Sequence, residues 1–269
     1  MRRIAGRRTD RGFVLIRVFR GSAFHTGEKR STKKHETSRR LIHEMAANLG
    51  KIIQKLKRFY GEPLPPKTSD PFELILQEGI AYLVDDERRE KALEHLRKTV
   101  GLQPGDILNA SPSQIDEATK LGGVAPHYRS VRIRESALIA LNEFGGDLSS
   151  ACKLPPSKAI KALKQFPGIG EPGAEKILLF TKNYAVLALD SNGLRVLLRI
   201  GFGEEKKNYS ASYKSVREAV SDQTGRDCDS LIEAHQLLRQ HGKTLCKTNK
   251  PRCEECPVSS MCAYFLQRR

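Results

Sequence analysis

Apolar residues recur every three to four positions along most of the chain, which is the spacing of amphipathic α-helices. The first clear case is the segment 36–60, where one helical stripe contains Leu41, Ile42, Met45, Leu49, Ile52, Ile53, Leu56 and Tyr60. Gly61 and the sequence PLPP end this helix, and a second helix begins at Pro71 with Asp70 as its N-cap. Similar helical segments are predicted at 87–100, 111–120, 127–144, 156–165, 172–183, 191–200, 210–223 and 228–241. No segment shows the sustained alternation of a β-strand, so the pattern predicts an all-α fold.

The composition agrees with a helical fold and adds a strong positive charge. Hydrophobic residues make up 39% of the 269 residues and aromatic residues only 6%, which suits a core of Leu, Ile and Ala. The net charge of +16 indicates a polyanionic partner, most simply nucleic acid. No apolar run approaches the roughly 20 residues that span a bilayer, so no membrane partner is expected.

Most of the excess positive charge lies near the N-terminus. Residues 1–66 contain 17 Lys or Arg residues and only 5 Asp or Glu residues. Residues 1–35 are therefore expected to form a basic, flexible tail without a catalytic role. Its composition is compatible with a DNA-binding tail, an organelle transit peptide, or translation annotated from a start codon too far upstream.

Four of the six cysteines lie close together near the C-terminus. Cys246, Cys253, Cys256 and Cys262 are separated by six, two and five residues. No secretory signal peptide is visible, so a metal site is favoured over a disulfide framework. Four thiolates suit either zinc or iron–sulfur chemistry. The spacing differs from the two Cys-x2-Cys pairs common in zinc sites, which favours iron–sulfur.

Two further segments carry candidate chemistry. In FPGIG, the residues Gly168, Ile169 and Gly170 form a tight turn between two predicted helices, where backbone N–H groups can bind a DNA phosphate. The alternative interpretation is an ordinary helical hairpin in which the glycines serve only the turn. Asp190 ends an apolar run and begins a helix. It is either a plain N-cap or a carboxylate placed to meet a nucleotide sugar.

Together these segments resemble the iron–sulfur branch of the helix-hairpin-helix (HhH-GPD) DNA glycosylase family, which contains endonuclease III and adenine DNA glycosylase. The cysteine spacing is similar to the signature of that branch's [4Fe–4S] site, and FPGIG resembles the family hairpin LPGVG. LALDSN lies where the family has its VDTH-type aspartate, and DPFELILQE resembles the family's second helix. The similarity covers roughly residues 36–265.

The resemblance implies a two-lobed fold with the active site in the cleft between a six-helix barrel domain and an iron–sulfur cluster domain. The expected parts are the tail, a cluster-domain helix at 36–70, the barrel at 71–185 and the rest of the cluster domain at 186–269. It also implies a monomer that acts on double-stranded DNA containing a lesion or mismatch. Such a protein is expected in the cytoplasm or nucleoid of a prokaryote, or in the nucleus or an organelle of a eukaryote.

Carried over by position, the resemblance assigns two catalytic acids. Asp190 is expected to stabilise the positive charge that develops on the sugar and to position water. Glu78 falls where adenine DNA glycosylase has the acid that protonates the departing purine, a role that suits a buried Glu with a raised pKa. From the residues alone, a solvated glutamate on an amphipathic helix is the preferred interpretation of Glu78.

One position departs from the strand-cleaving members of the family. Pro172 stands where those members have the lysine that forms a Schiff base with the sugar, and proline has no amine. This departure argues against lyase activity. Other lysines nearby are expected to be solvated helix surface: Lys158, Lys164 and Lys176.

The remaining predicted contacts are with DNA. Tyr82 and Leu83 occupy the place of the family's base-replacing wedge. His127, Tyr128 and Arg129 match a second hairpin, and Asn192 is a candidate contact to phosphate or sugar. Between the first two clustered cysteines, Lys247, Lys250 and Arg252 are expected to touch the DNA backbone.

These features predict a monofunctional base-excision DNA glycosylase that releases a damaged or mismatched base, with a purine such as adenine favoured. Two alternatives stay open. One is a glycosylase with lyase activity through a displaced lysine. The other is a protein that binds bent or branched DNA without chemistry.

Overall fold

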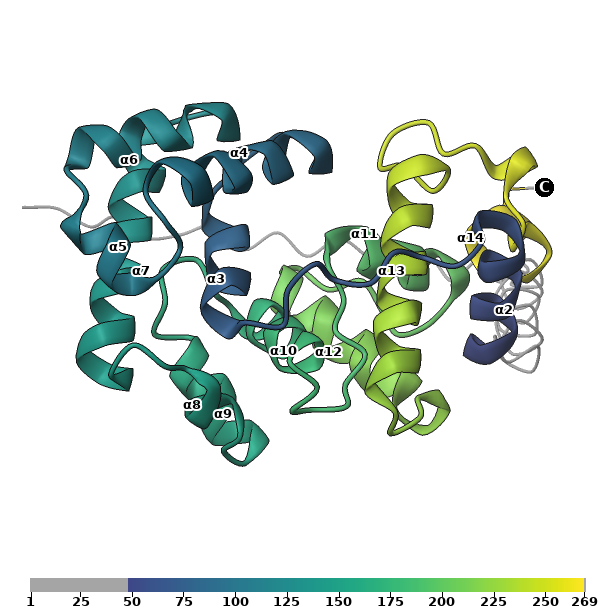
Figure 1. The fold of residues 1–269 in the computed structure, drawn as a ribbon. Helices are drawn as coiled ribbons and strands as arrows, with labels where there is room; N and C mark the ends of the chain where they lie inside the picture. Colours follow the sequence, from purple (N-terminus) through teal and green to yellow (C-terminus); the bar gives the residue numbers. More distant parts are fainter. Residues whose placement is uncertain (1–47, 269) are drawn as a thin grey trace, which may run out of the picture. The chain divides into compact units, whose positions relative to one another are not determined.

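Helices form nearly all the regular structure of residues 48–268, the part of the chain that the computed structural model describes (Figure 1). They are α2 (Leu49–Tyr60), α3 (Pro71–Gly79), α4 (Asp86–Thr99), α5 (Pro104–Asn109), α6 (Pro112–Thr119), α7 (Pro126–Phe144), α8 (Ser149–Cys152), α9 (Pro156–Leu163), α10 (Glu171–Phe180), α11 (Ser191–Ile200), α12 (Tyr209–Val220), α13 (Cys228–Thr244) and α14 (Ala263–Leu266). Within those residues the only β-type pairing is an isolated bridge between Tyr82 and Gly123. The predicted all-α fold is confirmed. The predicted tail, and Leu41, Ile42 and Met45 of the first predicted helix, lie outside the described residues.

The second helix begins where the sequence indicates. Asp70 is the N-cap of α3 and its Oδ1 accepts the Glu73 N–H at 2.7 Å, while Pro71 fills the first helical position. This fixes the start of α3 and places Glu78 in its last turn. None of the helices in the described part of the chain is both long and apolar enough to cross a bilayer.

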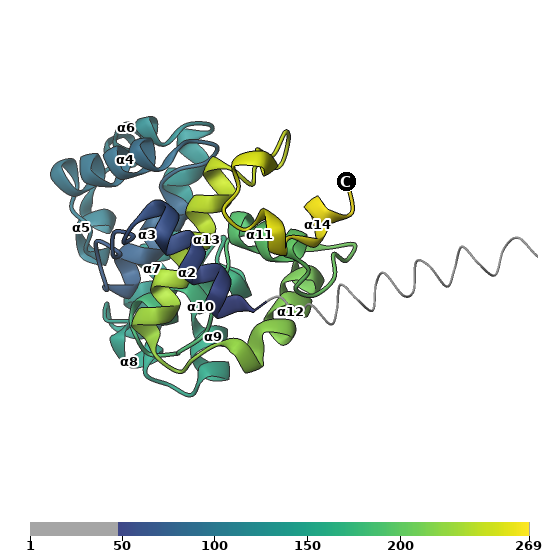
Figure 2. The ribbon, with the colours of Figure 1, turned by 90° about the vertical axis from the view of Figure 1, so that its right-hand side faces the viewer.

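Buried apolar side chains form two hydrophobic clusters. The first cluster runs from Phe72 to Leu178 and contains the buried faces of α3 to α9 and part of α10. The second combines residues 49–56 of α2 with residues 179–262, so that α2 packs against α13 from the opposite end of the chain (Figures 1 and 2). Two cores agree with the predicted two-lobed fold, and the exact domain limits stay predictions.

Helix α10 belongs to both clusters. Leu178 is buried in the first cluster, and the next residue, Leu179, is buried in the second. Accordingly, α10 packs against α3 on one side and α13 on the other. A side chain on α10 can therefore meet groups from both lobes, which decides the layout of the site.

Candidate active site

A cavity of about 620 Å³ lies where the two hydrophobic clusters adjoin. Its walls come from α3, α4, α10, α12 and α13 and from the residues around the start of α11. Both predicted catalytic acids, Glu78 and Asp190, line it. Side chains far apart in the sequence are thus brought to one place, and several of them are charged.

Asp190 is the N-cap of α11. Its Oδ1 accepts the N–H groups of Asn192 and Gly193, at 3.0 and 2.8 Å, and its Oδ2 lies 3.2 Å from Arg239 Nε. Burial alone would raise the pKa of this carboxyl, but the hydrogen bonds from Gly193 and Asn192 and the nearby Arg239 outweigh it and lower the pKa. Asp190 is therefore ionised and held in one orientation at neutral pH.

Asn192 is a predicted DNA contact, and its side-chain amide forms hydrogen bonds with other residues of the protein. Its Nδ2 donates to Asp190 Oδ2 at 3.0 Å, and its Oδ1 accepts from Arg195 Nη2 at 2.9 Å. Arg195 in turn donates to the backbone carbonyl of Cys246 at 2.9 Å. The start of α11 is thereby connected to the first clustered cysteine.

Glu78 forms an ion pair with Lys176 of α10 inside the cavity, and the two side chains are 31% and 19% exposed. Burial would raise the pKa of Glu78, but Lys176, with Arg89 and Arg239, lowers it instead. The expected raised pKa of Glu78 is therefore wrong. The expectation that Lys176 is solvated surface is also wrong, because α10 lies between α3 and α13 and turns this lysine inward.

Helix α13 supplies three groups that the sequence reasoning missed. His235, Arg239 and Lys243 recur every four residues, so they share one face of the helix, and all three line the cavity. His235 Nδ1 lies 2.7 Å from the Ala188 carbonyl oxygen, and burial lowers the pKa of His235 to about 4. His235 is therefore neutral at pH 7. The four-residue spacing of three basic side chains along one helical face was the signal that could have found them.

The predicted phosphate-binding turn forms between α9 and α10. Gly168 has φ +82°, a conformation that favours glycine, and the Ile169 N–H closes the turn onto the Phe166 carbonyl at 3.1 Å. Arg132 of α7 lies beside it: a Cβ built on Gly168 would be 3.2 Å from Arg132 Nη1. Backbone N–H groups at the start of α10 and this guanidinium together make the turn suitable for an anion.

The predicted wedge residues project from the loop after α3. Tyr82 is 61% exposed and Leu83 is 76% exposed with φ +57°. The Tyr82 N–H donates to the Gly122 carbonyl at 2.9 Å, which ties this loop to the loop that precedes α7. Tyr128, at the start of α7, is also exposed and lies under the Arg132 guanidinium. The wedge and the predicted second hairpin are thus neighbours.

Arg129 differs from its expected role as a DNA contact. It is 3% exposed, and its Nη2 donates to the carbonyls of Thr119 and Gly123 at 2.7 and 3.1 Å. It is therefore buried beneath the loop, and its hydrogen bonds are to the loop backbone. His127 is exposed, and its Nδ1 lies 3.1 Å from Asp116 Oδ2.

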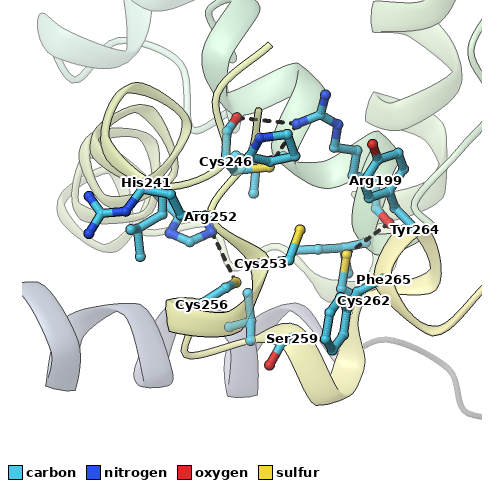
Figure 3. A pocket seen from close by; sticks show the side chains of 15 residues that line it. Arg199, His241, Cys246, Arg252, Cys253, Cys256, Ser259, Cys262, Tyr264 and Phe265 are labelled. Atoms are coloured by element: carbon cyan, nitrogen blue, oxygen red, sulfur yellow. Dashed lines mark hydrogen bonds between the residues drawn. The ribbon is translucent and has the colours of Figure 1, made fainter. Parts of the chain in front are cut away.

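The four clustered cysteines line one cavity beyond the end of α13 (Figure 3). None of them is in a disulfide. Among residues 48–268 no group of three or more His, Cys, Asp or Glu side chains stands arranged to hold a metal ion. The donor chemistry nevertheless fits a cluster: burial, together with the neighbouring thiols, raises the pKa of Cys256 to about 11. Four thiolates in this space need a bound cation to exist together at neutral pH.

Polar groups surround the thiols. Arg199 Nη1 lies 3.5 Å from Cys246 Sγ, and His241 Nε2 lies 3.5 Å from Cys256 Sγ. Arg199 also donates to the carbonyls of Lys247 and Thr248, at 2.7 and 3.0 Å, which holds the loop after Cys246.

Two of the three basic residues in that loop face solvent, and neither forms an ion pair with an acidic side chain among residues 48–268. Lys247 and Lys250 are exposed, and Lys250 has φ +51°. Arg252 is exposed as well but pairs with Glu255, so part of its charge is already used. The loop therefore presents Lys247 and Lys250 as a basic surface, and Arg199 holds its backbone through the Lys247 and Thr248 carbonyls.

Proteins with similar sequences include DNA repair enzymes. No protein-family model matches the chain. An endonuclease III of Sulfolobus acidocaldarius is 26% identical over 211 residues, covering 78% of this chain and 89% of that protein. A thymine-DNA glycosylase of Aeropyrum pernix is also 26% identical, over 77% of this chain and 90% of its own length.

Solved structures show the same fold. A thermostable thymine-DNA glycosylase superposes with a TM-score of 0.65 at 20% identity, covering 82% of this chain and 97% of the other. A trapped endonuclease III–DNA covalent intermediate also gives 0.65, at 17% identity over 81% and 95% of the two chains. The chain is therefore similar in sequence to endonuclease III and thymine-DNA glycosylase proteins, and it shares the fold of helix-hairpin-helix DNA glycosylases.

Proposed function

We propose that the protein is a base-excision DNA glycosylase that hydrolyses the N-glycosidic bond of a damaged or mismatched base, with a purine such as adenine favoured. The observation that carries the proposal is the placement of Asp190 and Glu78 in one cavity between the two hydrophobic clusters. Double-stranded DNA is the proposed partner. Action as a monomer is part of the proposal. The proposed compartment is that of the DNA it repairs, the nucleoid or, in a eukaryote, the nucleus or an organelle.

The mechanism begins with extrusion of the target nucleotide into the cavity. Tyr82 and Leu83 are exposed side chains of a size that can fill the vacated place in the duplex. Bond cleavage leaves positive charge on the sugar, and the ionised carboxylate of Asp190 stabilises that charge and positions the attacking water. Since Asp190 is already fixed by Asn192 and Gly193, little reorganisation is needed during the reaction.

Lyase activity is not part of the proposal. Pro172 has no amine, and each lysine that lines the cavity is paired with a carboxylate: Lys176 with Glu78, Lys243 with Asp86 and Lys67 with Glu90. An ammonium in such a pair has no free electron pair, so it must give up its proton before it can attack the sugar. The position of Lys176 is nevertheless the observation that favours the second candidate, a glycosylase with a displaced lysine.

One experiment tests the glycosylase proposal and separates the two candidates. Duplexes containing uracil, hypoxanthine, 8-oxoguanine, alkylpurines or mismatches are incubated with the protein, and strand breaks are compared with and without alkali and after borohydride reduction. We expect base release on part of this panel, strand breaks only after alkali, and no borohydride adduct. An adduct that disappears in Lys176→Gln but persists in the surface control Lys164→Gln would establish the lyase. No release from any duplex, with tight binding to branched DNA, would favour the non-catalytic alternative.

Glu78 is proposed as the acid that protonates a departing purine. Because Lys176 keeps the pKa of Glu78 below its ordinary value, this carboxyl is ionised at neutral pH and must gain a proton first. Purine release should therefore increase as the pH falls from neutral. Glu78→Gln should slow it by about 10²-fold and remove this increase. Single-turnover rates measured against pH test both statements.

Two variants sharpen the test of Glu78. Lys176→Met removes the charge that lowers the pKa of Glu78, so burial should raise that pKa and move the pH profile for purines to higher pH. Glu73→Gln is the control on the same helix, since Glu73 pairs with Arg97 away from the cavity. A pH profile of Glu78→Gln equal to that of the unmodified protein would exclude Glu78 as the acid.

A [4Fe–4S] cluster is the proposed cofactor, with Cys246, Cys253, Cys256 and Cys262 as its ligands. When bound, it would crosslink the segments that carry the four thiols and hold the basic loop between Cys246 and Cys253 in shape. Bond cleavage is assigned to the side chains of the other cavity.

A further inference from the structure

One guanidinium joins two carboxylates from different lobes. Arg239 of α13 lies with its Nε 3.2 Å from Asp190 Oδ2, and its Nη1 donates to Asp86 Oδ2 at 2.7 Å. Its Nη2 pairs with the other oxygen of Asp86, so Asp86 occupies the fork of the guanidinium. Lys243, one turn further along α13, also pairs with Asp86.

These contacts cross the candidate active site. Asp86 is the first residue of α4, whose apolar face is buried in the first hydrophobic cluster. Arg239 lies on α13, which is buried in the second cluster. All the groups of this ion-pair chain line the same cavity, and the Arg239 side chain is only 26% exposed.

We propose that Arg239 is a positioning residue of the reaction, which holds Asp190 through Nε alone while Asp86 keeps the guanidinium fork away from the catalytic carboxylate. This inference rests on the proposed role of Asp190 and deepens it. The inference assigns contact with the reacting sugar to Asp190 and to no other residue.

Arg239 contacts Asp190 through Nε and Asp86 through Nη1 and Nη2. This arrangement matters because Asp190 must meet two requirements. It must stay ionised in a half-buried site, which a nearby positive charge favours. It must also present negative charge to a cationic sugar, and a bidentate arginine would cancel much of that charge. With its fork on Asp86, Arg239 orients and stabilises the carboxylate through one atom and leaves the rest of the charge for the sugar.

Other charged or titratable groups lie near Asp190, and the test must account for them. They are Glu78 of α3, Arg89 and Glu90 of α4, Lys176 of α10, Arg195 of α11, Tyr209 of α12, and His235 and Lys243 of α13. Of these, His235 is neutral at pH 7 and the ammonium of Lys176 is paired with Glu78. Arg239 is therefore the cation that acts directly on Asp190 Oδ2.

The test compares Arg239→Gln, Arg239→Lys and Asp86→Asn. Single-turnover base release is measured across pH, on a duplex from which the unmodified protein releases a base. Arg239→Gln should lower the rate roughly tenfold to a hundredfold and move the acid limb of the pH profile to higher pH, because Asp190 then loses its proton less readily. Arg239→Lys keeps the charge, so the acid limb should stay near its original place while part of the rate is lost. Asp86→Asn frees the fork to pair with Asp190 and should also slow the reaction.

A double variant shows whether Asp86 acts through Arg239. Once Arg239 is glutamine, the Asp86→Asn change should add little to the loss, whereas independent roles would make the two losses multiply. Melting temperature and duplex binding are measured for every variant. If the glutamine variant does not fold, the lysine variant and Asp86→Asn decide the question alone. An unchanged rate and pH profile in the folded variants would overturn the inference. Full activity of Asp190→Asn would overturn the proposed role of Asp190, and no base release by the unmodified protein would overturn the proposed function itself.

Discussion

Replacing Asp190 with asparagine should lower base release by roughly 10²- to 10⁴-fold while duplex binding stays close to that of the unmodified protein. Asparagine is as good an N-cap as aspartate, so it can keep the hydrogen bonds from the Asn192 and Gly193 N–H groups that begin α11. What it loses is the negative charge that faces the sugar. The expected result is therefore a folded protein that binds DNA and does not release the base.

The chain offers a matched control for this substitution. Asp227 caps α13 in the same way, with its carboxylate accepting from the backbone of Asp229 and Ser230, but it is exposed and does not line the cavity. Asp227→Asn should leave single-turnover base release unchanged. Equal activity of Asp190→Asn and the unmodified protein, at similar melting temperatures, would show that Asp190 is a structural cap only.

The sequence predicted best those features that depend on neighbouring residues. The turn at Gly168–Gly170 and the caps Asp70 and Asp190 are local: each needs only a few adjacent residues to form, and the structure has all of them. The spacing of the four cysteines is local as well, and they do line one cavity.

Contacts between distant segments could not be predicted in the same way. Lys176 and Glu78 are 98 positions apart, and their pairing depends on how α10 lies between α3 and α13. A helical pattern shows that Lys176 is polar but does not show that a second lobe covers it. For this reason the pKa of Glu78 was expected to move in the wrong direction.

Arg129 illustrates the opposite error. A basic residue in a predicted DNA-contacting segment suggests a phosphate contact, and its neighbours His127 and Tyr128 are indeed exposed. One helical turn of α7 points Arg129 inward, where carbonyls of the loop before the helix accept its N–H groups. Which face of α7 is buried depends on its packing against α5 and α6, which the sequence of the helix alone does not contain.

Replacing Cys256 with serine is the second change expected to have a large effect. Serine removes one proposed ligand, so the purified protein should lose iron and sulfide, measured by chemical analysis and by its visible absorption. The free energy of unfolding should fall by more than about 3 kcal/mol, because binding energy of a structural cofactor is also folding energy. The loss should reach the candidate active site as well, because Arg195 connects the Cys246 carbonyl to Asn192, which holds Asp190. Base release should therefore decline even in the fraction that stays folded.

Cys228→Ser is the control, since Cys228 is the first residue of α13 and does not line the cysteine cavity. Full iron content and an unchanged melting temperature in Cys256→Ser would contradict the assignment of Cys256 as a ligand.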